Sequence, residues 1–325
     1  MNRKKKLKLL RRKCTKPFET LAIYGLLVVV KCFTLRGARR LASVLGSLFI
    51  QTPEVKKLVM ANLDVAFPKK SHQEKKRIAR LSQTNLIMVF VEFLWFYGRA
   101  HKIHEKTTYE AGGLEKFKEM KAASGDDKAL ILLTMHLSNW EITSQSFQLV
   151  HPSSLVCVAR KIKNDSLEHI MYSGRTELGV DIAHQEGAVR SLMKNLKNKQ
   201  TVGLLIDQNT KLKEGGIYGD FFGLPTTITK SPSTLARKFK ADVCFTHGFR
   251  TKDGFEVRLT PLEKSVDEFS GDEEFSAYLL EQMQGFIQEH PELWVWYYKR
   301  WDSWPKSHAH LAEKYPFYAK EDRFS

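Results

Sequence analysis

A histidine and a glutamate stand five residues apart, directly after an apolar run that is typical of a buried strand. The run is ALILLT (129–134), and His136 and Glu141 follow it within MHLSNWE. A carboxylate on one ring nitrogen fixes the tautomer of a histidine and stabilises its imidazolium, so that the other nitrogen can act as a general base. We therefore expect His136 to take a proton from a hydroxyl, with Glu141 as its carboxylate partner.

The sequence offers neither a protein nucleophile nor a metal site to go with this pair. No serine or cysteine stands in a GxSxG or comparable context, so the attacking hydroxyl is expected to belong to the substrate. HExxH is absent, and Cys14, Cys32, Cys157 and Cys244 share no CxxC spacing. We predict no metal, no redox cofactor and a reducing compartment. The His-Glu spacing alone is weak, because a histidine at a strand end often has only a structural role.

An α/β sheet is needed to position these residues. Short apolar runs alternate with amphipathic segments, which predicts strands at 129–134, 154–159, 179–183, 201–206, 241–249 and 255–259 and helices at 165–178, 188–197 and 231–240. This order predicts an α/β fold with a mostly parallel or mixed sheet flanked by helices. In such sheets, sites lie at the carboxyl ends of the strands, where His136 stands.

The region from 36 to 110 is predicted to be helical. Its apolar residues recur at spacings of three and four, as in Leu41, Val44, Leu45 and Leu48. The run from 85 to 98 carries only one charge and is apolar on all sides, so as a helix it is expected in the core rather than against lipid.

The positive charge is concentrated at the amino-terminal end. The formal net charge is +16, and residues 1–80 carry 21 Lys/Arg against 4 Asp/Glu, with nine cations in the first sixteen positions. The run TLAIYGLLVVV (20–30) follows without a charge. An eleven-residue helix reaches only about half of the ~30 Å hydrocarbon thickness, so we predict an interfacial anchor rather than a span. The expected organisation is a basic tail and hydrophobic membrane anchor (1–35) and a catalytic domain (36–325), made of the helical front section (36–110) and an α/β core (111–325).

Two other interpretations of this end remain open. The apolar run could be an ordinary buried helix with the basic tail as a solvated arm. The tail could also bind nucleic acid, although that would leave the apolar run unexplained and no recognition motif accompanies it. Because anionic lipid attracts each nearby Lys or Arg by about 1 kcal/mol, the tail and the run together favour a membrane surface, and no nucleic-acid partner is expected.

Several motifs in order resemble one known family. His136-Leu-Ser-Asn139-Trp140-Glu141 is similar to the first block of the glycerolipid acyltransferase superfamily, and in particular of the late acyltransferases of lipid A biosynthesis, the lauroyl and myristoyl transferases. The other matching stretches are NLDVAFP (62–68), Asp207-Gln208, FFGLP (221–225) with Leu235-Ala236, and PELWVW (291–296) with Arg300-Trp301. The resemblance spans residues 20–305.

The resemblance implies a set of site residues. His136 and Glu141 would be catalytic, and the implied substrate-binding residues are Asn139, Arg160, Asn164, Asp207, Gln208, Phe221, Phe222 and Gly223. Arg160 or the backbone amides near Phe222-Gly223 would stabilise a tetrahedral oxyanion. The family commonly has Arg-Pro-x-x-Asn-Pro where this chain has RKIKND (160–165), so both prolines are missing. Arg175 and Gly179 match the family's R-x-x-x-G spacing and are expected to be structural.

The activity that the resemblance implies is transfer of a fatty acyl chain from a thioester, on acyl carrier protein or coenzyme A, to a hydroxyl of a lipid A precursor or related glycolipid. The enzyme would work at the inner membrane with its catalytic domain facing the cytosol, beside an anionic lipid acceptor. Alternatives are transfer to another phospholipid or glycolipid, a hydrolase with the same histidine chemistry, and a non-catalytic membrane- or nucleic-acid-binding protein on a degenerate acyltransferase fold.

Overall fold

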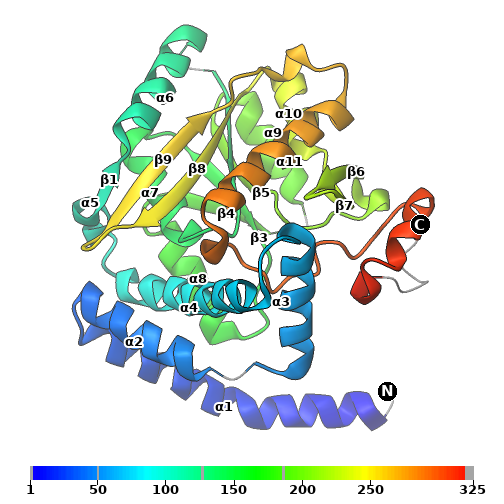
Figure 1. Ribbon diagram of the computed structural model, residues 1–325. Coiled ribbons are helices and arrows are strands. Elements are labelled where there is room, and N and C mark those ends of the chain that lie inside the picture. The colour runs from blue at the N-terminus through cyan, green and yellow to red at the C-terminus, as the bar shows by residue number, and fades with distance from the viewer. Residues whose placement is uncertain (1–2, 50, 126–127, 185–186, 319–325) are drawn as a thin grey trace.

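The computed structural model describes residues 3–49, 51–125, 128–184 and 187–318 (Figure 1). For residues 3–16 it describes the backbone only, so the side chains of the predicted basic tail lie outside the described part. The fold is mixed α/β, with a mostly parallel sheet flanked by helices and a group of helices at the amino-terminal side.

One seven-stranded sheet forms the centre. Its strands, in spatial order, are β1 (Thr107–Tyr109), β9 (Phe255–Pro261), β8 (Asp242–Arg250), β2 (Leu130–Thr134), β5 (Thr201–Leu205), β3 (Leu155–Ala159) and β4 (Val180–His184). All neighbouring pairs are parallel except β8 with β9. The six predicted strands are confirmed, each within two residues. β1 was not predicted, and neither was the separate antiparallel hairpin of β6 (Gly216–Phe221) and β7 (Leu224–Thr229).

Alternate residues of the buried strands face two different layers of helices. Ile131 and Leu133 lie in a core with α9 (Ala188–Lys197), α10 (Ser231–Phe239) and α11 (Asp272–Glu289). Leu130 and Leu132 lie in a second core with α6 (Ala111–Ser124) and α7 (Trp140–Val150). This period of two explains why the central strands read as continuous apolar runs, since both of their faces are covered.

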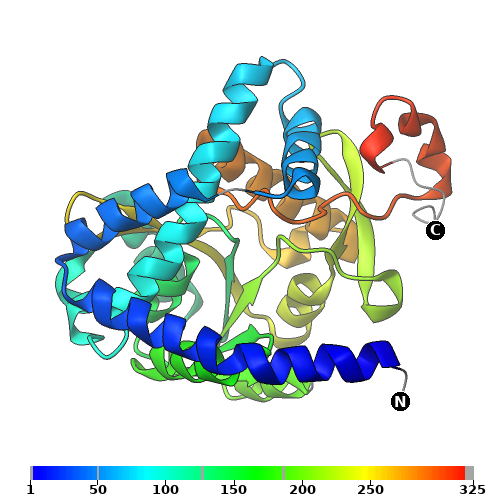
Figure 2. The same cartoon turned by 90° about the horizontal axis from the view of Figure 1, so that it is seen from below.

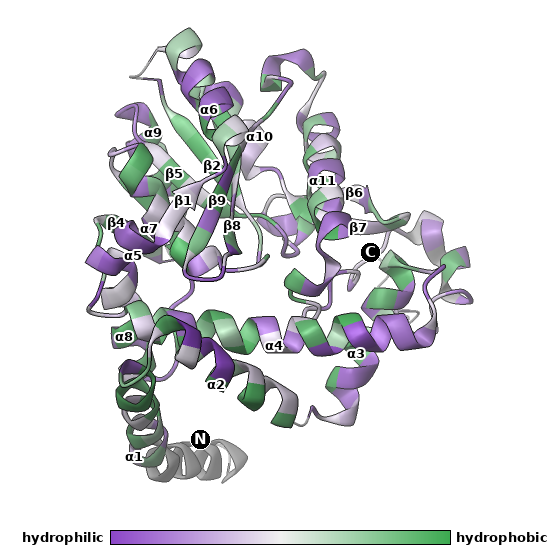
Figure 3. Cartoon of the chain, turned by 60° about the vertical axis from the view of Figure 1, so that its left-hand side comes forward, coloured by the Kyte–Doolittle hydropathy of each residue, from purple (hydrophilic) through white to green (hydrophobic). Residues whose placement is uncertain are grey.

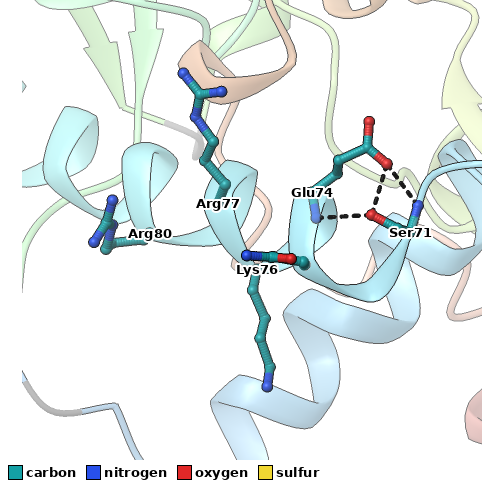
Figure 4. Close-up of a pocket in the computed structure, with 6 residues that line it drawn as sticks. Ser71, Glu74, Lys76, Arg77 and Arg80 are labelled. Carbon is teal, nitrogen blue, oxygen red and sulfur yellow. Dashed lines mark hydrogen bonds between the residues drawn. The ribbon is translucent and has the colours of Figure 1, made fainter.

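The helical front section is organised around one long helix, α4 (His72–Phe96). The helices α1 (Arg3–Lys31), α2 (Leu35–Leu48) and α3 (Pro53–Ala66) pack on it, and α5 (His101–Lys106) and α8 (Asp165–Thr176) complete this side of the molecule (Figure 2). A capping box of Ser71 and Glu74 fixes the start of α4 (Figure 4). The end of α4, from Phe93 to Phe96, is buried, which confirms that the apolar run of 85–98 belongs to the core.

The predicted membrane anchor has a different structure from the one expected. The apolar run continues the basic tail in one 29-residue helix, α1, in which Leu27 and Val30 are buried among residues of α4. Within the described residues, none of the helices combines the length and apolar character that crossing a bilayer would require.

After α11 the described part of the chain contains only short helical turns joined by loops. These are η3 (Pro291–Leu293), η4 (Lys306–Ala312) and η5 (Pro316–Tyr318), and two more, η1 (Leu212–Glu214) and η2 (Val266–Glu268), lie earlier in the chain. The segment 291–301 carries the tryptophan motif and crosses the carboxyl end of β2, where Leu137 forms a bridge with Trp294. It thereby reaches the loop that holds His136.

Candidate active site

His136 lies just beyond β2, and its carboxylate partner is Asp207. The Nδ1 atom of His136 lies 2.8 Å from the Oδ1 atom of Asp207, and the backbone N–H of His136 donates to Oδ2 of the same carboxylate at 2.8 Å. Thr134 and Leu205, the last residues of β2 and β5, are partners in the parallel register of these strands. His136 and Asp207 each lie two positions past these strand ends, so they lie side by side. With Nδ1 engaged, Nε2 is the ring nitrogen left to act as a base toward a hydroxyl.

Asp207 is held by a second donor, the indole N–H of Trp294, which reaches its Oδ2 atom at 2.9 Å. The carboxylate is buried, with 3% of its side chain exposed. Its oxygens therefore accept hydrogen bonds from the histidine ring, the histidine backbone and the tryptophan. The sequence predicted Asp207 as a substrate-binding residue, whereas in the structure its carboxylate is hydrogen-bonded to His136. It included Trp294 only as part of the matching stretch PELWVW and did not predict this hydrogen bond.

The electrostatics of the pair favour charge on both partners. Burial disfavours the imidazolium, but the charge and hydrogen bond of Asp207, with a further contribution from Glu141, outweigh it and raise the pKa of His136 above its ordinary value. Burial also opposes ionisation of Asp207, yet His136 and Trp294 hold the pKa of that carboxyl below its ordinary value. A histidine with a raised pKa is a stronger base and accepts a proton more readily.

Glu141 lies in the first turn of α7 and pairs with Arg175 of α8. The guanidinium of Arg175 is bidentate, with Nε to Oε2 at 2.8 Å and Nη2 to Oε1 at 2.7 Å. The indole of Trp140 also donates to Oε1 at 3.1 Å. The expectation that Glu141 is the hydrogen-bonded partner of His136 is therefore corrected, because its carboxylate is oriented by Arg175. Glu141 still acts on His136 through its charge, and a catalytic role for it stays a prediction.

A cavity of about 920 Å³ adjoins these groups. His136, Glu141 and Arg175 line it together with residues from the carboxyl-terminal halves of β3 and β5. It combines two kinds of lining, charged or polar groups (Arg160, Gln208, Lys211 and Glu214) and apolar groups (Leu132, Val158, Ile182, Leu192, Leu204 and Ile206). A ligand with a polar head and a hydrocarbon chain suits such a lining.

Two of the predicted substrate-binding residues, Arg160 and Gln208, line the cavity and are exposed at its surface. Arg160 follows β3 directly and Gln208 lies three positions past β5, so both are at the carboxyl ends of parallel strands, where sites in such sheets are found. Contact with a substrate stays a prediction for both.

Asn139 and Asn164 have structural partners instead. Asn139 is fully buried, caps α7 by accepting from the backbone N–H of Ile142 at 3.1 Å, and donates to Oε2 of Glu92 at 2.7 Å. Asn164 caps α8 and donates to Glu19 of α1 at 2.9 Å. Neither residue lines the cavity. Asparagine is a preferred cap because its side-chain oxygen satisfies free backbone N–H groups. Substrate binding by these two residues stays a prediction.

The hairpin residues Phe221, Phe222 and Gly223 also lie outside the cavity lining. The N–H of Phe222 donates to Oε1 of Gln284 at 2.8 Å and that of Gly223 donates to Oδ1 of Asp220 at 2.8 Å, so neither amide is available to an oxyanion. Both turn residues have positive φ, 57° and 74°, as the tightest β-hairpin turn requires. The structure thus shows these residues in a turn, and substrate binding by their side chains stays a prediction.

Arg175 is the main site residue that the sequence interpretation set aside as structural. Its position at the cavity and its bidentate pair with Glu141 place it among the residues that shape the site. The R-x-x-x-G spacing was the available signal, but it does not say which carboxylate the arginine meets.

The fold and the site together define an α/β protein with a histidine–carboxylate pair at the ends of two parallel strands, beside a cavity with polar and apolar linings. Comparison with known proteins then identifies the family. The chain belongs to the bacterial lipid A biosynthesis acyltransferase family, whose model matches residues 4–303. The suspected family is therefore confirmed.

The relatives share low identity with the chain. A phosphatidylinositol mannoside acyltransferase of Mycobacterium tuberculosis (strain ATCC 25618 / H37Rv) is 26% identical over 195 residues, 58% of this chain and 59% of that protein's length. The lipid A biosynthesis palmitoleoyltransferase of Escherichia coli (strain K12) is 20% identical over 256 residues, 77% of this chain and 79% of that protein. The chain thus spans about three fifths of the length of the mycobacterial relative.

Proposed function

We propose that the protein transfers a fatty acyl chain from a thioester donor, carried by acyl carrier protein or coenzyme A, to a hydroxyl of a lipid A precursor or related glycolipid. The observation that carries this proposal is the His136–Asp207 pair beside a cavity that charged and apolar residues line together. The family supports acyl transfer in general. The names of the relatives supply two acceptor classes to test, lipid A precursors and phosphatidylinositol mannosides.

The proposed reaction uses Nε2 of His136 as general base. The acceptor hydroxyl gives its proton to Nε2 while its oxygen attacks the thioester carbonyl carbon. The resulting tetrahedral oxyanion collapses by breaking the carbon–sulfur bond, and the thiolate leaves with the proton from the imidazolium. Asp207 stabilises that imidazolium and fixes the ring, which is the contribution expected of a carboxylate behind a histidine base.

In this proposal, different residues of the cavity bind different parts of the substrates. The apolar walls receive the acyl chain, since each buried methylene contributes about 0.8 kcal/mol. Arg160, which lines the cavity, would bind an acceptor phosphate or the developing oxyanion. Replacement by lysine keeps the charge but loses the planar fork, so Arg160→Lys is expected to reduce turnover strongly.

The site of action in this proposal is the cytosolic face of the inner membrane. The concentration of cations in residues 1–80 and the apolar run of α1 support a surface rich in anionic lipid. No cofactor takes part in the proposed reaction beyond the thioester donor itself.

The test is mass spectrometry of reactions that contain purified protein, a lipid acceptor and either acyl-acyl carrier protein or acyl-coenzyme A. We expect one added acyl mass on one lipid class, and no such product with His136→Ala. Circular dichroism would establish that the variant is folded. Release of free fatty acid without an acylated lipid would instead select the hydrolase, and an active, folded His136→Ala protein would overturn the mechanism.

A further inference from the structure

Apart from Leu35, the buried residues of α2 are small, and most of its large apolar residues are exposed. Ala38, Ala42 and Gly46 are buried, and a Cβ atom added to Gly46 would lie 2.9 Å from the Cα atom of Thr84 in α4. On the outside, Leu48 is 69% exposed and Phe49 is 60% exposed. A helix of a water-soluble protein ordinarily has the opposite arrangement, with its large apolar side chains in the core.

The outer residues form one continuous stripe. Positions 41, 44, 45, 48 and 49 recur at the three- and four-residue spacing that places side chains on one face of a helix. We call the set of Leu41, Val44, Leu45, Leu48 and Phe49 the outer α2 stripe; all but Leu41 are more than a third exposed. Contiguous exposed apolar surface of this kind marks an interaction site.

Helix α1 also exposes large apolar side chains. Phe18, Leu21 and Val28 of that helix are 75%, 72% and 63% exposed. α1 and α2 lie together at the lower edge of the molecule in Figure 1 and face the viewer in Figure 2, and Figure 3 shows hydrophobic segments on both. Two helices at this edge of the protein therefore each expose large apolar side chains.

Exposed cations lie within α2 and near its carboxyl-terminal end. Arg40 precedes Val44 by one helical turn, and Lys76, Arg77 and Arg80 extend from α4 (Figure 4). Gln83, which follows Arg80 by about one turn, donates to the backbone oxygen of Phe49 at 3.1 Å, so these cations lie within about two turns of the end of α2. Apolar side chains bordered by Lys and Arg complement a bilayer with an apolar interior and anionic headgroups.

We propose that the outer α2 stripe is a second membrane-contacting surface, which lies in the interface of a bilayer that contains anionic lipid. The apolar side chains enter the boundary of headgroups and acyl chains, and the cations of α2 and α4 meet the phosphates. The surface lies beyond the predicted anchor of residues 1–35. It does not depend on the reaction proposed above, because vesicle binding needs neither donor nor acceptor.

The experiment is flotation of the full chain with vesicles of phosphatidylcholine alone and of phosphatidylcholine with phosphatidylglycerol (3:1). The test variant is Val44→Glu/Leu48→Glu, which places charge on the stripe and leaves the buried face of α2 unchanged. Removing two large apolar contacts is expected to weaken binding to both vesicle types by at least about tenfold. Lys76→Glu/Arg80→Glu should weaken binding only to the anionic vesicles, and less so at high salt.

Leu212→Glu is the matched control, since Leu212 is also apolar and exposed (43%) but lies on η1, in the α/β part of the chain. Its binding should equal that of the unaltered protein. If Val44→Glu/Leu48→Glu failed to fold, Leu48→Ser/Phe49→Ser would replace it. Unchanged vesicle binding by a folded stripe variant would overturn the proposal. So would self-association of the unaltered protein that the stripe variant abolishes, because a second copy would then cover the surface.

Discussion

At the scale of single residues, the main difference between sequence and structure concerns the carboxylate on His136. The sequence shows Glu141 five positions away, whereas Asp207 lies 71 positions away and reaches the ring only because β2 and β5 are neighbours. The sequence predicted both strand ends and placed both residues at them. It could not give the order of strands in the sheet, and that order decides which carboxylate meets the histidine.

The role of Asp207 makes a prediction about pH. Asp207→Asn removes the charge that raises the pKa of His136, so the pKa should fall and the neutral, basic imidazole should persist to lower pH. The acid limb of the profile of kcat/KM against pH should move to lower pH, and the plateau should drop by at least about 100-fold because the imidazolium is no longer stabilised. Steady-state rates from pH 5 to 9 measure both effects. An acid limb at the same pH in Asp207→Asn would show that Asp207 does not raise the pKa of the general base.

Gly203 makes a prediction about the acyl chain. A Cβ atom at this position would lie 2.6 Å from the Sγ atom of Cys157, and both residues line the cavity. Gly203→Ala should therefore narrow the apolar part and shift preference toward shorter acyl donors in a competition assay. Gly112→Ala is the control, since a Cβ atom there meets nothing within 4 Å. An unchanged preference would place the chain elsewhere in the cavity.

At the scale of elements, buried charges hold the loop between β2 and α7, which carries His136, against the front section. Glu92 of α4 is fully buried and pairs with Arg39 of α2 at 2.6 Å and with Arg250 of β8 at 2.8 Å, while it also accepts from Asn139 at the start of α7. The sequence presented Glu92 only as the single charge of an apolar helix. Its partners come from three distant segments, so no local pattern could identify them.

The α7–α8 contact makes a prediction about stability and activity together. Arg175→Met leaves Glu141 largely buried without its bidentate partner, which should destabilise the protein by about 3 kcal/mol. Glu141→Gln/Arg175→Met should recover much of that loss, because no unpaired charge remains, yet its turnover should stay low if the charge of Glu141 supports His136. Urea denaturation and steady-state kinetics of the four proteins in the cycle separate the two effects. Full activity in the double variant would assign Glu141 a purely structural role.

Helices and central strands of this fold were predictable because their periodicity is strong. The missed strands are those with weak signals. β6 contains two glycines, β7 contains a proline, and β1 has three residues. Such strands depend on their partners rather than on local preference, so only the folded chain identifies them.

At the scale of the whole molecule, the predicted anchor (1–35) packs tightly against the predicted catalytic domain (36–325). Leu27, Val30 and Leu35 are 8%, 0% and 4% exposed and lie in one core cluster with Phe93 and Leu94 of α4. The sequence could predict that residues 20–30 are apolar. It could not say which side of that helix meets protein and which remains exposed.

This boundary makes a prediction about truncation. Deleting residues 1–35 should lower the melting temperature strongly, since each of the three buried side chains contributes about 1.5 to 3 kcal/mol. Deleting residues 1–16 should leave the melting temperature nearly unchanged and weaken only salt-dependent membrane binding. Differential scanning calorimetry of both truncations tests this. An unaltered melting temperature after removal of residues 1–35 would support a separable anchor after all.

The segment 291–301 has a consequence for the order in which the protein becomes competent. Leu293 accepts from the backbone N–H of Ser138 at 2.9 Å, Val295 donates to the backbone oxygen of His136 at 3.1 Å, and Asn62 of α3 donates to that of Trp296 at 2.7 Å. These contacts join residues that are far apart in the sequence. Such contacts form late in folding, because the loss of chain entropy on closing a long loop comes before the contacts can stabilise it. A refolding chain should therefore regain its helices and sheet before the hydrogen bond from Trp294 to Asp207 forms. Catalytic power would then be the last property of the native state to return.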